Sequence, residues 1–95
     1  MIAEKEECDG SEKSLDYMST IEECAKGCEA EASMFAFGTN DYGKNRCIEA
    51  GCMCLCETSA SSDGTCNQVS HMGYRLYKYK PDGKALIYSN ASYLN

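Results

Sequence analysis

The chain has 95 residues, eight of them cysteine, and a formal net charge of −6. Leu, Ile, Val and Phe together number only twelve and there is no Trp, so apolar burial barely offsets the conformational entropy of folding. The acidic balance argues against nucleic-acid binding, which usually needs a net basic face. We therefore expect one small domain that is stabilised by disulfides or by a structural metal.

The first clear element is a helix expected over residues 21–31. Before it, residues 1–7 are charged and are expected to form a disordered arm, and a short strand or turn is expected at residues 15–18. Ser19 and Thr20 are each followed three residues later by glutamate, so either can open a capping box. The apolar positions follow the i, i+3, i+4, i+7 spacing of one buried helical face: Ile21, Cys24, Ala25 and Cys28.

The rest of the chain has the pattern of strands and turns. Residues 34–38, MFAFG, predict a short strand, and a second strand is expected to start near Arg46 and to continue through CMCLCE. A polar loop follows. The segment 73–80, GYRLYKYK, predicts a strand with Tyr74 and Leu76 on one face and Tyr77 and Tyr79 on the other. After a turn at Pro81-Asp82-Gly83, residues 81–95 are expected to form a hairpin or a tail.

The cysteine spacing allows disulfides between the helix and a strand. Cys24 and Cys28 lie one helical turn apart, with β-carbons about 6 Å apart. Cys52, Cys54 and Cys56 project from one face of a strand at intervals of about 6.6 Å. The two spacings nearly match, but they do not fix the pairs, and eight cysteines allow 105 connectivities. All eight cysteines are expected to form disulfides: Cys8, Cys24, Cys28, Cys47, Cys52, Cys54, Cys56 and Cys66.

A metal centre or a catalytic site is a weaker interpretation of the same residues. Structural zinc usually takes C-x₂₋₄-C pairs, and a C-x-C-x-C strand does not wrap one ion well. His71 is the only histidine, and no C-x-x-C redox motif occurs. We therefore expect no metal, no cofactor and no enzymatic activity.

The helix segment TIEECAKGC, followed by MFAFG, RC and a closing GYRLYKY, resembles the PAN/apple domains. The resemblance covers about residues 8–80, between the arm 1–7 and the hairpin or tail 81–95. It implies an α+β fold in which a single helix packs on a small, curved antiparallel sheet and disulfides staple the two together.

The resemblance also implies disulfide pairs. Cys24 and Cys28 match the helix pair of the family, and Cys47 matches the strand cysteine that bonds the first of them, which favours Cys24–Cys47. The family partner of Cys28 would fall at Met34, so Cys28 needs another partner, for which Cys54 is our choice. The other cysteines then pair among themselves: Cys8 and Cys66 with each other or with Cys52 and Cys56.

By this resemblance the protein is an extracellular, non-catalytic recognition or adhesion module that binds a glycan or a protein. It is expected to be secreted or to be the extracellular part of a cell-surface protein. The alternative is a small secreted disulfide-rich signal, pheromone-like or toxin-like, that acts on a receptor through the loop Thr58–Thr65. Its oligomeric state stays open.

The expected contact surface is the one opposite the helix, supplied by the last strand. Aromatic rings there can stack on a ligand and cations can pair with acidic groups. The candidate ligand-binding residues are Arg75, Tyr77, Lys78, Tyr79 and Lys80. Asn90 begins an N-glycosylation tripeptide. No apolar run reaches the length of a membrane span, so no membrane insertion is expected.

Overall fold

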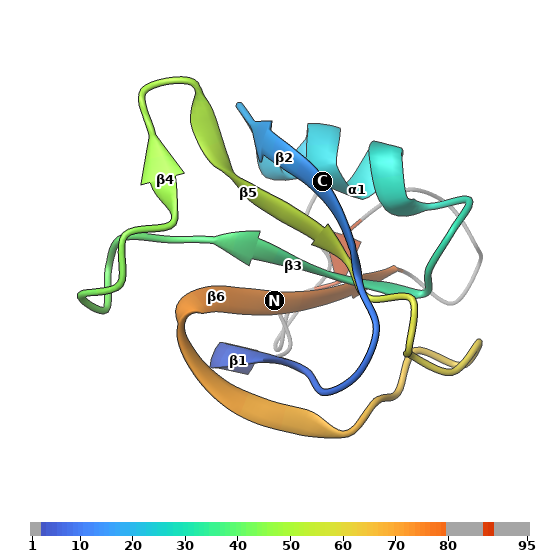
Figure 1. Ribbon diagram of the computed structural model, residues 1–95. Coiled ribbons are helices and arrows are strands. Elements are labelled where there is room, and N and C mark those ends of the chain that lie inside the picture. Colours follow the sequence, from blue (N-terminus) through green and yellow to red (C-terminus); the bar gives the residue numbers. More distant parts are fainter. Residues whose placement is uncertain (1–2, 80–86, 89–95) are drawn as a thin grey trace.

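The computed structural model describes residues 3–79 and 87–88 of the chain. One helix packs on an antiparallel sheet, so the predicted α+β fold is confirmed (Figure 1). The elements are β1 Ala3–Cys8, β2 Lys13–Met18, α1 Ile21–Cys28, β3 Met34–Gly38, β4 Cys47–Ile48, β5 Gly51–Cys56, β6 Gln68–Tyr79 and β7 Ile87–Tyr88.

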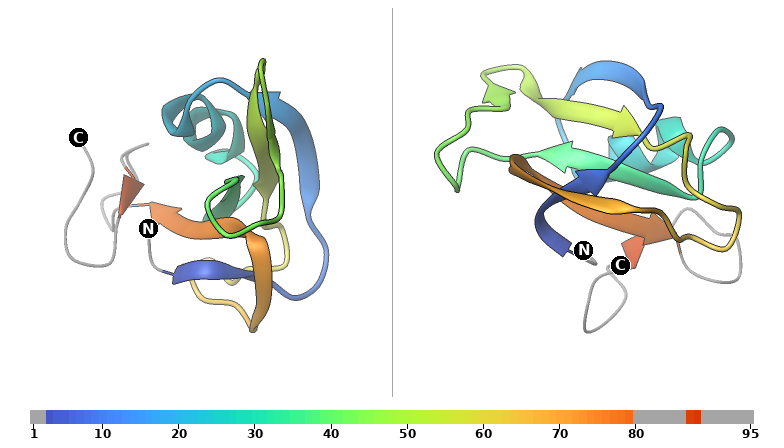
Figure 2. Two further views of the ribbon diagram at one scale, coloured as in Figure 1. Left: turned by 90° about the vertical axis from the view of Figure 1, so that its left-hand side faces the viewer. Right: turned by 60° about the horizontal axis from the view of Figure 1, so that its bottom comes forward.

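Within the described residues the strand order is β1-β6-β3-β5-β2, with β4 added to β5 and β7 added to β6. In the left view of Figure 2, β5 stands upright while β6 runs across it, so the sheet is strongly twisted. The long strand β6 pairs with β3 through its residues 74–78 and with β1 through its residues 68–70 and 75–76. The sheet thus curls, and β1 with the far half of β6 lies below its centre in Figure 1.

The helix forms where its capping residues predict. The Thr20 hydroxyl accepts a hydrogen bond from the Glu23 amide at 3.1 Å, and the Ser19 hydroxyl donates to the Glu23 carboxylate. The helix ends at Cys28, earlier than the predicted residue 31. There the Cys28 carbonyl accepts from two amides in the following turn, both at 3.0 Å, and this turn leads the chain into β3.

Strand β3 is the centre of the core, because both of its faces are covered. All five of its residues are buried. Phe35 and Phe37 pack toward the helix with Cys24, Cys28 and Tyr77. On the other face, a second cluster fills the space inside the curled sheet: Cys8, Met34, Ala36, Leu55, Tyr74 and Leu76. A chain with few aliphatic residues therefore builds its core largely from cysteine and aromatic side chains.

Four disulfides join these elements, and together they include all eight cysteines as predicted: Cys8–Cys66, Cys24–Cys54, Cys28–Cys56 and Cys47–Cys52. The general expectation of helix-to-strand bridges is confirmed. Cysteines one helical turn apart on α1 meet cysteines two residues apart on β5. The Cα atoms of the two bridged pairs are 5.6 and 5.2 Å apart.

The two favoured pairs, however, are wrong. Cys47 lies in β4 directly opposite Cys52, so these two bond to each other and Cys24 bonds to Cys54 instead. The second predicted pair, Cys28–Cys54, comes close, since its sulfurs are 3.8 Å apart. Cys28 bonds to the next cysteine on the same face of β5, two residues further along. Cys8–Cys66 is one of the alternatives left open.

Three predicted segments also differ from the structure. The expected disordered arm 1–7 contains most of strand β1, which β6 holds by backbone pairing despite its charged sequence. The expected continuous strand after Arg46 is a hairpin, because the chain turns between β4 and β5. Of the expected C-terminal hairpin, β7 pairs with the end of β6 as predicted. The rest of residues 80–95, including Lys80 and Asn90, lies outside the described residues.

Gly51, at the β4–β5 turn, gives a testable prediction about this packing. Its φ is +143°, and a β-carbon there would lie 2.1 Å from the Met18 carbonyl oxygen. We expect Gly51→Ala to lower the free energy of unfolding by about 3 kcal/mol, from backbone strain and this clash. Gly43→Ala is the control, since its φ is +91° but nothing lies within 4 Å of the added carbon. It should cost about 1 kcal/mol. Equal losses in urea unfolding of the two variants would contradict this account.

Candidate functional site

The alternation of β6 places the predicted ligand-binding residues on different faces of the sheet. Tyr77 and Tyr79 point toward the helix, while Tyr74 and Leu76 point to the opposite cluster, so the predicted division of faces is confirmed. The predicted placement of these tyrosines on the surface opposite the helix is wrong, because both lie on the helix side. The reason is the pairing of Phe35 with Tyr77 across β3 and β6, which fixes the register.

Tyr77 is part of the core. Its side chain is 4% exposed, and its ring stacks on Phe35 with 5.1 Å between the centroids and 8° between the planes. Burial raises the pKa of the Tyr77 phenol. A ligand therefore does not reach this residue, and the aromatic pair replaces aliphatic residues that the chain lacks.

The two predicted cations within the described residues are also engaged. Arg75 pairs with Asp41 at 2.5 Å and donates to the Tyr42 hydroxyl at 3.2 Å, and Glu4 lies 3.8 Å away. Two carboxylates thus neutralise the positive charge of Arg75, so this residue has no unpaired charge to offer an acidic ligand. Lys78 is half-buried, and its stem packs along Gly64.

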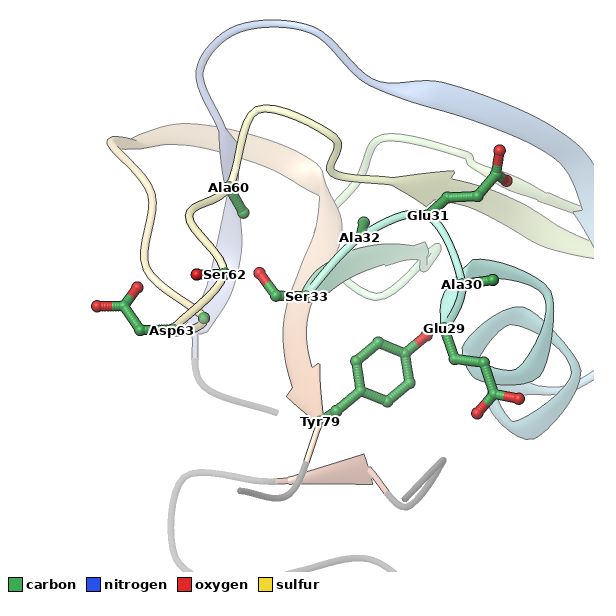
Figure 3. A pocket seen from close by; sticks show the side chains of 10 residues that line it. Glu29, Ala30, Glu31, Ala32, Ser33, Ala60, Ser62, Asp63 and Tyr79 are labelled. Carbon is green, nitrogen blue, oxygen red and sulfur yellow. The ribbon is translucent and has the colours of Figure 1, made fainter. Parts of the chain in front are cut away.

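Tyr79 is the predicted residue that the structure places at a pocket (Figure 3). The ring is half-buried beside Phe35, and its hydroxyl donates to the Ala25 carbonyl of the helix, which fixes the ring in place. Burial, together with the negative charge of Glu29, raises the pKa of Tyr79 well above its ordinary value. The phenol is therefore neutral at physiological pH and forms a rigid aromatic wall.

Two loops that are far apart in the sequence form the other walls. One follows the helix and the other joins β5 to β6, and they face each other across the pocket in Figure 3. The cavity has a volume of about 670 Å³. Its lining residues are Glu29, Ala30, Glu31, Ala32, Ser33, Ala60, Ser62, Asp63, Gly64 and Tyr79. This volume lies within the usual range of small-ligand sites.

The pocket is acidic. Glu29, Glu31 and Asp63 line it, and no cation of the described residues does. Glu31 pairs with Lys13 at 2.7 Å, and Asp63 accepts a hydrogen bond from the Thr65 hydroxyl at 2.7 Å. Alanine side chains and the tyrosine ring lie between these carboxylates. Such a surface suits a lysine or arginine side chain of a ligand. Its apolar stem can pack along the alanine and tyrosine side chains, and its charged head can lie near the carboxylates.

Part of this site was within reach of the sequence. The loop Thr58–Thr65, proposed as a recognition segment of a secreted signal, supplies one wall. Residues 29–31 were missed because the predicted helix included them, whereas the structure ends the helix at Cys28 and forms a turn there that brings residues 29–33 to the pocket. The sequence offered one indication of this turn: the chain must leave the helix before the strand that starts at Met34.

His71 lies away from this pocket. Its Nδ1 accepts from the Gly73 amide at 3.0 Å, and its ring packs edge-on against Tyr74. Burial, followed by the charge of Arg46, lowers its pKa, so it is neutral at pH 7. Because all eight cysteines are in disulfides, the chain offers no thiol for nucleophilic chemistry beside it.

Comparison with protein-family models, with curated proteins and with solved structures finds no match to this chain. The four disulfides indicate an oxidising environment such as the extracellular space. Among the described residues, no helix has the length and apolar character that crossing a bilayer requires.

Proposed function

We propose that this protein is an extracellular, non-catalytic recognition module that binds a basic segment of a protein partner in the pocket beside Tyr79. The observation that carries the proposal is the acidic, partly apolar lining of that pocket between two loops. Its location at loop ends on a disulfide-braced scaffold is typical of recognition sites.

The resemblance to PAN/apple domains supports the same class of function. In this chain a pair of helix cysteines is tied to the sheet, although the partners are Cys54 and Cys56 rather than those implied by the family. We propose that the chain is a divergent member, in which the C-x-C-x-C strand takes over the tethering of the helix. Secretion or display on a cell surface is part of this proposal.

The sequence analysis expects either a glycan or a protein as the ligand, and the negative charge of the pocket favours one of them. A sulfated or otherwise acidic glycan would meet the carboxylates of Glu29 and Asp63, whereas a lysine or arginine would pair with them. Glu31 contributes less, because Lys13 already pairs with it. The net charge of −6 adds a long-range attraction for a basic partner. These two features favour a basic peptide segment over an acidic polysaccharide.

The test is the affinity of fluorescein-labelled hexalysine, measured by fluorescence anisotropy. We expect the double variant Glu29→Gln/Asp63→Asn to bind at least about tenfold more weakly, since it removes two charge-assisted contacts. The matched control is Glu22→Gln/Glu49→Gln, which makes the same charge change at exposed positions outside the pocket.

Equal weakening in the two double variants would mean that hexalysine senses only net charge, and the proposal would fail. Binding of neutral maltohexaose that depends on Glu29 and Asp63, without binding of hexalysine, would replace a basic protein by a glycan as the ligand.

A further inference from the structure

A second group of carboxylates lies outside the pocket, around the end of β5. Glu57 follows Cys56 and is 0% exposed. One of its carboxylate oxygens, Oε2, accepts a hydrogen bond from the Cys8 amide at 2.7 Å. The other oxygen, Oε1, is buried and has no hydrogen-bond partner within the described residues. A buried carboxylate oxygen without a hydrogen-bond partner is costly, so a proton or a bound cation is expected there.

Two further carboxylates lie close to that of Glu57. Glu7 comes from β1 and is half-buried, and Glu12 comes from the β1–β2 segment and is exposed. One oxygen from each of Glu7, Glu12 and Glu57 can be chosen so that all three lie within 4.8 Å of one another. Like charges held this close repel each other unless a proton or a cation lies between them.

We propose that Glu7, Glu12 and Glu57 form a calcium-binding site. Calcium takes oxygen ligands at about 2.3–2.6 Å, so any two ligands of one ion are at most about 5.2 Å apart, and three oxygens within 4.8 Å of one another satisfy this limit. Because Oε2 of Glu57 already accepts the Cys8 amide, the three carboxylates can supply up to five further oxygens. Magnesium needs shorter, strictly octahedral contacts, and zinc prefers the nitrogen and sulfur ligands that this group lacks.

The arrangement also provides a path for the ion and a reason for modest affinity. Glu12 is exposed, so the site opens to solvent on that side. The nearby groups are Asp9, which adds negative charge, Arg46, which opposes a cation, and His71, whose Nε2 is 4.0 Å from Glu7. Sites with few ligands in extracellular modules have dissociation constants of roughly 0.1–1 mM, which matches the calcium level outside cells.

The experiment is calcium titration of the full chain by isothermal calorimetry, with the thermal midpoint as a second measurement. We expect binding with a dissociation constant of roughly 1 mM or lower. At a calcium concentration of ten times that constant, the thermal midpoint should rise by roughly 6–11 °C. Magnesium at the same concentration should produce little effect.

Two ligand variants are used, so that the test still works if a substitution at the buried Glu57 prevents folding. Glu57→Gln and the exposed Glu12→Gln should each weaken calcium binding at least about tenfold, the loss of one charged ligand. Glu49→Gln, at the exposed β4–β5 turn, should bind as the parent does.

Absence of a calcium effect at 10 mM in a folded chain would overturn the proposal and leave shared protons as the stabilising partner of Glu57. Unchanged binding in both the Glu12 and Glu57 variants would also overturn it. Neither result involves hexalysine, so the proposed recognition pocket is tested independently.

Discussion

The double variant Cys24→Ala/Cys54→Ala is expected to lose most of the stability of the fold. This disulfide closes a segment with a sequence separation of 30, and its removal frees the unfolded chain at a cost of ~4 kcal/mol. Both cysteines are fully buried between the helix and the sheet, so truncation also leaves unfilled space in the core. Small domains have only about 5–15 kcal/mol in total, and this one has few aliphatic residues to compensate.

Urea unfolding followed by circular dichroism measures this loss. The matched control is Cys47→Ala/Cys52→Ala, whose disulfide spans a separation of only 5 between half-buried residues in the β4–β5 hairpin. The control should cost ~2 kcal/mol by the same chain-entropy argument. If the hairpin pair proved as costly as the helix pair, the helix-to-sheet tether would not be the main support of the fold.

Stability should fall as the pH rises, and Glu57 should account for much of the slope. Its pKa is raised from the ordinary value of 4.5 to about 9, first by burial and then by Glu12. Between these two values the folded protein holds a proton that the unfolded chain releases. The free energy of unfolding therefore decreases across this interval, by up to about 1.4 kcal/mol per pH unit from this group. The contribution is complete below pH 4.5 and is lost once the pH exceeds the folded pKa.

Other ionisable groups around Glu57 contribute to the measured profile. They are Glu7, Asp9, Glu12, His71 and Arg46. The experiment is urea unfolding between pH 5 and 9 in EDTA, so that no divalent cation takes part. The free energy of unfolding of Glu57→Gln should change much less with pH than that of the parent, and that of Glu49→Gln should change as the parent's does. Parallel profiles for the parent and Glu57→Gln would show that Glu57 ionises in the folded state without cost.

The fold was accessible from the sequence because two periodicities coincide in it. The helix positions from Ile21 to Cys28 and the alternating cysteines of β5 both predict a single buried face, and the structure joins these faces. The exact pairs were not accessible. They depend on the register of α1 along β5, and shifting that register by one cysteine changes Cys24–Cys54 and Cys28–Cys56 into other pairs without altering either pattern.

Strand β1 could not be predicted for a related reason. Its sequence, AEKEEC, has none of the alternation or β-branched residues of a strand. It is extended because it pairs with the edge of β6 opposite β3, and the Cys8–Cys66 disulfide fixes its end. This is a tertiary effect that overrides local preference.

The candidate site was predicted in part. Tyr79 and the loop around Asp63 were singled out for separate reasons, and only the fold brings them together. Tyr77 and Arg75 are of residue types that often bind ligands. In the structure, however, Tyr77 stacks on Phe35 and Arg75 pairs with Asp41. Composition alone does not distinguish a side chain that serves the core from one that meets a ligand.

The central proposal is that basic ligands bind in the pocket beside Tyr79, and an NMR titration of the isotope-labelled chain with unlabelled hexalysine tests it most directly. The account predicts that the backbone amide shifts concentrate in the pocket lining, at residues 29–33, 60, 62–64 and 79. Shifts that concentrate at Glu7 and Glu12 instead, or that spread over all acidic surfaces without a centre at the pocket, would contradict it.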